Sequence, residues 1–186
     1  MTLQKIADSV TKLKNKYGET DPFRLCKDLG IKILYSPMGT HEGACKGFYM
    51  ECKRIKTITI NSDLPKIIQR IIAAHELGHA LHHRNPSTVH AFHEISMFDE
   101  TTVYEKEANL FAAELLLDDQ AVIDALNCDV SFFGAASLLC VPAELLDFKF
   151  RVMKWKGYKI TDTPLVSDSN FLKDIYVPAN YDNHIC

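Results

Sequence analysis

The residues best suited to chemistry form one short cluster, His75-Glu76-Leu77-Gly78-His79, with the spacing H-E-x-x-H. If this segment is helical, residues four apart lie one turn apart on the same face, so both imidazoles can bind one metal ion. Glu76 would lie beside them, where a carboxylate can take a proton from water and return it to a leaving amine. The cluster therefore predicts metal-dependent hydrolysis, with His75 and His79 as ligands and Glu76 as general base.

The face that carries the two histidines is expected to point into the protein. Ile68, Ile71 and Ile72 precede His75 on the same helical stripe. Polar groups buried without partners cost free energy, and a metal ion would remove that cost. A catalytic zinc site uses three protein ligands and leaves one position open, so a third ligand must be found.

His82 lies on the same face as His75 but is a poor candidate for the third ligand. Two helical turns separate these residues by about 10.5 Å along the axis, too far to share one ion. The longer motif H-E-x-x-H-x-x-G-x-x-H also fails, because His82 and Asn85 occupy its Gly and last His positions. We expect His82 and His83 to be ordinary residues of the helix end, where positive charge suits the helix dipole.

The third ligand should therefore come from the next strong helical segment, residues 103–117. Its acidic candidates are Glu105, Glu107 and Glu114. Glu105 is favoured because Asn109 lies one turn later beside the small Ala108, which would allow a close approach to the histidine helix. The Asn109 amide could then hydrogen-bond a ligand. Glu107 is expected to have a surface or capping role, and Glu114 is the third choice.

The remaining pattern predicts an α+β fold, mainly helical, with a small mixed β-sheet in a single domain. The expected helices cover residues 3–17, 22–29, 65–83, 103–117, 131–140 and 142–155, the strands 31–35, 48–52 and 55–60, and a loop 85–101. Strand 55–60 directly precedes the histidine helix, so it either pairs along its edge with an extended substrate or is a plain core strand. The domain is expected to end at residue 160, leaving a polar tail, 161–186.

The composition is that of a folded protein. The 186 residues include 21 Lys and Arg, 24 Asp and Glu and 47% hydrophobic residues, with a net charge of -3. This content suits one domain with its own core and excludes a globally basic surface for nucleic acid. No apolar run can span a bilayer, and the N-terminus lacks the apolar block of a signal peptide. We therefore expect a cytoplasmic protein with no membrane contact and with reduced cysteines.

A basic cluster around Trp155 is the local feature that could suggest nucleic-acid binding. It consists of Lys149, Arg151, Lys154, Lys156 and Lys159. The helix pair in residues 131–155 has the outline of a helix-turn-helix, but both helices use their apolar residues for packing. We interpret the cluster as a solvated helix end and do not expect direct nucleic-acid binding.

Two segments taken together resemble one known family. HELGHALHH, residues 75–83, is followed by EKEANLFAAELLL, residues 105–117, and this pair is similar to the ImmA/IrrE family of metallopeptidases. The segments ITINSDLP and FFGAASLLCVPAELLDFKF also resemble that family, so the likeness covers residues 1–155. One departure is Leu117-Asp118-Asp119, where the family often has Pro.

The resemblance implies a zincin-like core and a gluzincin-like zinc metalloendopeptidase that holds one Zn²⁺ ion. It assigns the metal ligands to His75, His79 and Glu105, and the general base to Glu76. Family members from mobile genetic elements are anti-repressors that cut a helix-turn-helix repressor, usually encoded nearby. A protein substrate of this kind is therefore the expected partner.

Two other functions stay open. The chain could be a non-catalytic regulator that keeps the metal site, or a toxin-antitoxin partner that binds without cutting. A structural zinc site is usually closed by four protein ligands, whereas three candidates are found here. The donor that would stabilise an oxyanion also stays open among Tyr49, His90, His93 and Tyr104.

Overall fold

The first two helices begin at the residues that their caps predict. The computed structural model describes residues 1–83, 90–91, 100–169 and 171–174. Helix α1 (Leu3–Tyr17) starts after Thr2, whose hydroxyl accepts a backbone hydrogen bond, and stops at Gly18, which has a left-handed φ of 62°. Helix α2 (Pro22–Asp28) starts after Asp21, which caps it in the same way.

Among the described residues, the sheet has four strands in the order β1-β3-β2-β4. Its strands are β1 (Ile31–Ser36), β2 (Gly47–Cys52), β3 (Ile55–Asn61) and β4 (His90–Ala91). Strand β3 runs parallel to β1 and antiparallel to β2, and β2 is also antiparallel to β4. Since β3 is paired along both sides, it has no free edge for a substrate. The interpretation of residues 55–60 as a substrate-binding edge is therefore wrong, and β3 is a core strand.

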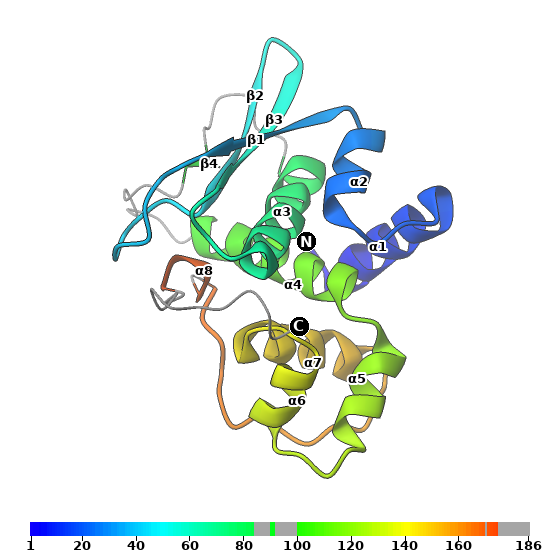
Figure 1. The fold of residues 1–186 in the computed structure, drawn as a ribbon. Helices are drawn as coiled ribbons and strands as arrows, with labels where there is room; N and C mark the ends of the chain where they lie inside the picture. Colours follow the sequence, from blue (N-terminus) through cyan, green and yellow to red (C-terminus); the bar gives the residue numbers. More distant parts are fainter. Residues whose placement is uncertain (84–89, 92–99, 170, 175–186) are drawn as a thin grey trace.

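Helix α3 (Lys66–His82) packs against this sheet (Figure 1). On β3, Ile58 and Ile60 are completely buried. On β2, a Cβ atom added to Gly47 would lie 2.5 Å from Cγ2 of Ile72 in α3, so glycine is needed for the close approach. The result is a helix that is buried along most of its length, including its polar H-E-x-x-H segment.

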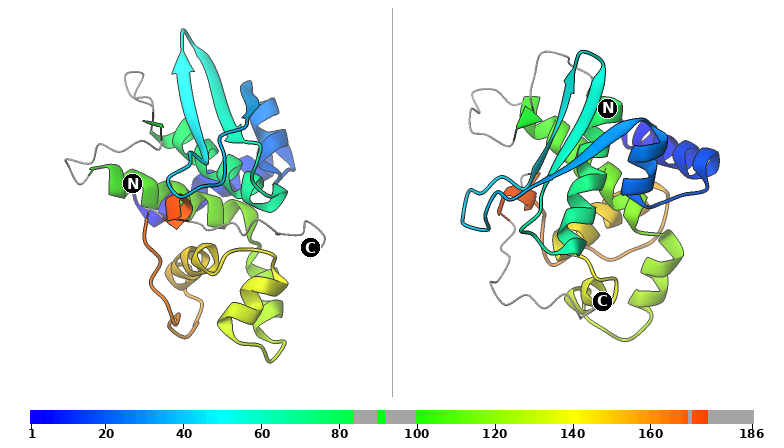
Figure 2. Two further views of the ribbon diagram at one scale, coloured as in Figure 1. Left: turned by 60° about the vertical axis from the view of Figure 1, so that its left-hand side comes forward. Right: turned by 45° about the horizontal axis from the view of Figure 1, so that its top comes forward.

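Helix α4 (Glu100–Leu116) lies between the sheet-and-α3 layer and the C-terminal helices (Figure 1 and Figure 2). These C-terminal helices are α5 (Asp119–Leu126), α6 (Phe132–Leu138) and α7 (Ala143–Trp155). The short helix α8 (Phe171–Asp174) lies apart from them, beside α4 (Figure 1). Helix α5 was not predicted. It starts after Asp118, whose carboxylate accepts backbone hydrogen bonds from the first turn.

The basic cluster is used largely for ion pairs inside the fold. Lys149 is only 1% exposed, and its Nζ lies 2.7 Å from Glu114 and 2.5 Å from Asp119. Lys156 reaches the same two carboxylates at 2.5 and 2.8 Å. The prediction of a solvated helix end is therefore wrong for Lys149, which joins α4, α5 and α7.

The segment after α7 folds back onto that helix. The carboxylate of Asp147 accepts hydrogen bonds from the Thr163 hydroxyl at 2.6 Å and from the Ser167 amide at 3.0 Å. Phe171 is buried, and its ring lies 5.6 Å from that of Phe148. We call residues 161–169 and 171–172 the C-terminal strap. The division of the chain at residue 160 stays a prediction.

The observed elements confirm the α+β fold class with a small mixed sheet. Most of the expected loop 85–101 lies outside the described residues. Within the described residues, no helix is long and apolar enough to cross a membrane. Of the five cysteines in the described part of the chain, four are free thiols (Cys26, Cys45, Cys52 and Cys128), but Cys140 is disulfide-bonded, against the prediction of reduced cysteines.

Candidate metal centre

Helix α3 places His75 and His79 one turn apart with their rings facing each other. Both residues are at most 1% exposed. The ring centroids are 4.7 Å apart in an edge-to-face arrangement, and the two Nε2 atoms are 3.0 Å apart. The i, i+4 spacing thus produces the pair of converging nitrogens that the sequence predicts.

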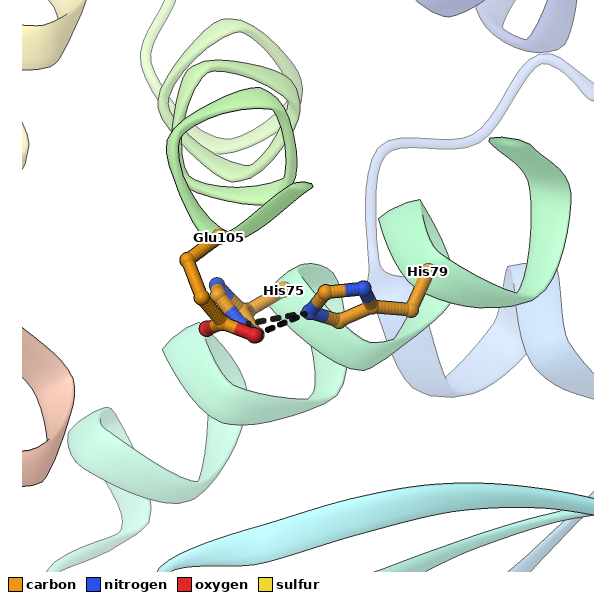
Figure 3. A group of neighbouring side chains, drawn as sticks. All are labelled: His75, His79 and Glu105. Carbon is orange, nitrogen blue, oxygen red and sulfur yellow. Dashed lines mark hydrogen bonds and ion pairs between the residues drawn. The ribbon is translucent and has the colours of Figure 1, made fainter. Parts of the chain in front are cut away.

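Helix α4 brings Glu105 to the same point (Figure 3). One carboxylate oxygen lies 3.2 Å from Nε2 of His75, and the other lies 3.4 Å from Nε2 of His79. Single ligand atoms of these three residues all lie within 4.8 Å of one another. Among the three acidic candidates of this helix, Glu105 is the one that meets both imidazoles.

The side chains around this point suit a cation. Nδ1 of His75 lies 2.7 Å from Oδ1 of Asn109, whose amide nitrogen donates to the Ser169 carbonyl at 2.7 Å. Because Oδ1 can only accept, Nδ1 of His75 carries the proton and Nε2 keeps a lone pair. The buried Oε2 of Glu105 accepts no hydrogen bond from the described residues. A positive ion would satisfy these converging lone pairs.

Neighbouring charges and burial shift the pKa values of Glu105 and His75 in opposite directions. Burial raises the pKa of Glu105, but the His75 and His79 rings beside it, when protonated, donate to the carboxylate and attract its charge. They outweigh burial and hold the pKa of Glu105 well below its usual range. Burial lowers the pKa of His75, yet Glu105, Glu76 and Asn109 together raise it. The carboxylate therefore stays ionised, as a metal ligand must be.

Glu76 is fully buried next to this group. The backbone amide of Tyr49 lies near enough to lower the pKa of this carboxyl, but neither carboxylate oxygen has a well-aligned hydrogen bond with the described residues. Burial raises the pKa of Glu76 to about 8, with the charge of His75 acting against the rise and that of Glu105 adding to it. A buried carboxylate with a raised pKa is typical of a proton acceptor in an active site.

Comparison with known proteins gives the class of this site. Residues 26–151 match a peptidase family model described as an IrrE N-terminal-like domain. The chain belongs to this ImmA/IrrE-type family. The family consists of metallopeptidases, so membership implies a metal ion and a protein substrate.

Two relatives cover most of the chain. "Uncharacterized immunity region protein 2" of Bacillus phage phi105 is 36% identical over 144 residues, which is 77% of this chain and 88% of the relative. "Metallopeptidase ImmA" of Bacillus subtilis (strain 168) is 27% identical over 150 residues, which is 80% of this chain and 85% of that protein. The four segments that carry the resemblance all lie inside residues 26–151.

Asn109 has the contact that the sequence predicts in this metallopeptidase. Its side chain is completely buried and bridges His75 to Ser169. The sequence pattern does not predict the contact with Ser169, because that residue lies in the polar tail expected after the domain. The C-terminal strap therefore reaches the residues around the centre.

His83 and Glu107 are the main corrections. His83 is not an ordinary helix-end residue: it is 8% exposed, and its Nδ1 lies 2.9 Å from Nδ1 of His79. Glu107 is not a surface or capping residue: it is 6% exposed, and Oε2 lies 2.8 Å from Nε2 of His83. The amino group of Met1 lies against the other oxygen of Glu107.

The other candidate ligands, Glu114 and His82, lie apart from the metal centre. Glu114 pairs with Lys149 and Lys156, as described above. His82 contacts Ser9 and Phe111, in agreement with the prediction that it is not a ligand.

The four candidate oxyanion donors differ in their surroundings. The Tyr49 hydroxyl donates to Glu51 at 3.0 Å. The ring of Tyr104 lies 4.7 Å from that of His83 and is 37% exposed. The side chains of His90 and His93 lie outside the described residues.

Proposed function

We propose that this metallopeptidase is a zinc-dependent endopeptidase in which His75, His79 and Glu105 hold one Zn²⁺ ion. The observation that carries the proposal is the convergence of their ligand atoms, within 4.8 Å of one another, from two buried helices. Two imidazoles and one carboxylate form a common ligand set of catalytic zinc, with one position left open. The H-E-x-x-H spacing places the proposed general base, Glu76, directly beside this set.

When bound, zinc supplies a Lewis acid that polarises the scissile carbonyl and acidifies water. Glu76 takes the proton from the attacking water at a carboxylate oxygen and delivers it to the nitrogen of the leaving amine. A neighbouring positive charge favours the ionised form of Glu76 and so lowers its pKa from about 8. Burial keeps bulk water away from this proton transfer.

For the substrate, we propose a helix-turn-helix repressor encoded near this protein, which would make the protein an anti-repressor of a mobile genetic element. Two observations support this choice. The sequence resembles the ImmA/IrrE family, whose mobile-element members cut such repressors. In addition, one relative is named as an immunity region protein of a phage.

The test is to incubate the zinc-loaded protein with the nearest encoded helix-turn-helix repressor. We expect a discrete cleavage product with the wild type and no product with Glu76→Gln, while elemental analysis finds the same zinc content in both proteins. Equal cleavage by Glu76→Gln would overturn the role of Glu76. A stable uncut complex with the wild type would instead favour the non-catalytic binding functions.

A further inference from the structure

His83 and Glu107 form a chain of hydrogen bonds that ends on His79. His83 comes one helical turn after His79, and Glu107 lies on α4 two residues after Glu105. The Nδ1–Nδ1 distance between His79 and His83 is 2.9 Å, and the distance from Nε2 of His83 to Oε2 of Glu107 is 2.8 Å. The ring of Tyr104 packs on His83 at 4.7 Å. Both nitrogens of His83 are thus engaged in a buried setting.

The chemistry of these groups sets the direction of each hydrogen bond. A carboxylate only accepts, so Nε2 of His83 donates its proton to Glu107. In the neutral ring the other nitrogen, Nδ1, then has a lone pair and accepts from Nδ1 of His79. The proton of His79 is consequently held on Nδ1, and its Nε2 keeps the lone pair that faces Glu105.

We propose that His83 and Glu107 are positioning residues, which hold His79 in the tautomer that can bind the metal. The inference rests on the proposed metal site. The opposite tautomer would place an N–H group where the ion must lie. His75 is held in the same tautomer by a different device, the Asn109 amide. The two histidines are thus oriented independently, one through an amide and one through an imidazole and a carboxylate.

The first test uses the wild-type protein without metal. Long-range proton–nitrogen NMR correlations of the His79 ring distinguish a proton on Nδ1 from one on Nε2. We expect the proton on Nδ1. A proton mainly on Nε2 in the folded wild type would overturn the proposal, whether or not the protein proves to be a peptidase.

The second test compares His83→Asn with His83→Leu, two side chains of similar size. The amide oxygen of Asn can replace Nδ1 as the acceptor for His79, whereas Leu cannot. We expect His83→Leu to show a mixture of His79 tautomers and to bind zinc about 10–100-fold more weakly in competition with a chelator. His83→Asn should keep the Nδ1–H tautomer and most of the affinity.

The matched control is His82→Leu. This removes the neighbouring imidazole, which contacts Ser9 rather than the centre, so we expect wild-type zinc affinity. Unchanged tautomer and affinity in a folded His83→Leu would overturn the positioning role and leave the proposed peptidase function standing. If the wild type bound no zinc, the proposed function would fail, while the His79 tautomer would still test the hydrogen-bond chain.

Discussion

Gly78 on α3 lies directly against Ala108 on α4, because a Cβ atom added to Gly78 would be 3.3 Å from the Cα of Ala108. The same atom would lie 3.2 Å from the ring of Phe111. The absence of a side chain at Gly78 lets the two helices approach closely. Glu105 precedes Ala108 by about one turn, so this approach brings its carboxylate to the two imidazoles.

Gly78→Val should therefore damage both the fold and the metal site. Extra methyl groups in a packed interface cost about 1–3 kcal/mol, and a displaced α4 would carry Glu105 away from His75 and His79. Urea denaturation and zinc titration measure the two effects. Gly78→Ala is the control. It adds a single methyl group, whose destabilising effect is partly offset by a gain in helix propensity of up to about 1 kcal/mol. Full stability and zinc affinity in Gly78→Val would contradict this interpretation of the helix contact.

The zinc affinity of Glu105→Ala should fall by orders of magnitude, because only the two imidazole ligands remain. Glu107→Ala should have a smaller effect, a loss of about 10–100-fold, because it acts on the centre through His83. Lys106→Ala, an exposed position between them, should bind zinc like the wild type. Competition titrations with a chromophoric chelator rank the three variants. Retention of zinc by Glu105→Ala would place the third ligand elsewhere.

Asn109→Ala should weaken the centre and loosen the C-terminal strap together. The change leaves the Nδ1–H of His75 and the carbonyl of Ser169 without their buried partner, at a cost of about 1–3 kcal/mol. We expect weaker zinc binding and faster hydrogen exchange of the backbone amides in the C-terminal strap. Asn127→Ala, at an exposed position, is the control. Unchanged exchange in Asn109→Ala would mean that the strap is held without this contact.

The metal-free protein should lose stability with rising pH because of Glu76. The pKa of Glu76 is raised from 4.5 to about 8 in the folded state, so the native state holds the extra proton between these values. The contribution of Glu76 to the free energy of unfolding is fully present below about pH 4.5. Above that pH it decreases by at most about 1.4 kcal/mol per pH unit, until the carboxyl has ionised above pH 8. The free energy of unfolding of Glu76→Gln minus that of the wild type should therefore increase from pH 5 to pH 8.

Denaturation series in the presence of a chelator measure this difference. Bound zinc should reduce the pH dependence, because a positive charge lowers the pKa of the carboxyl. A difference that stays constant from pH 5 to pH 8 would show that Glu76 is not held in its neutral form in the folded protein.

The local sequence pattern was sufficient to predict those features of this protein that depend on a single helix. The spacing of His75, Glu76 and His79 determines which side chains share a face, because helical geometry repeats every 3.6 residues. The caps at Asp21 and Gly18 likewise act within one turn. The preference for Glu105 over Glu107 as the residue that meets both histidines came from the small residues beside it, which is again a property of one helix face.

Tertiary packing decided the rest. The contact of His83 with Glu107, the contact of Asn109 with Ser169 and the central place of β3 all join segments that are distant along the chain. The periodicity of a single segment does not predict which distant side chains come into contact, because those contacts depend on how α3, α4, the sheet and the C-terminal strap pack together. The sequence by itself therefore determined the residues that converge on the centre, and only the tertiary structure decided which residues hold them in place.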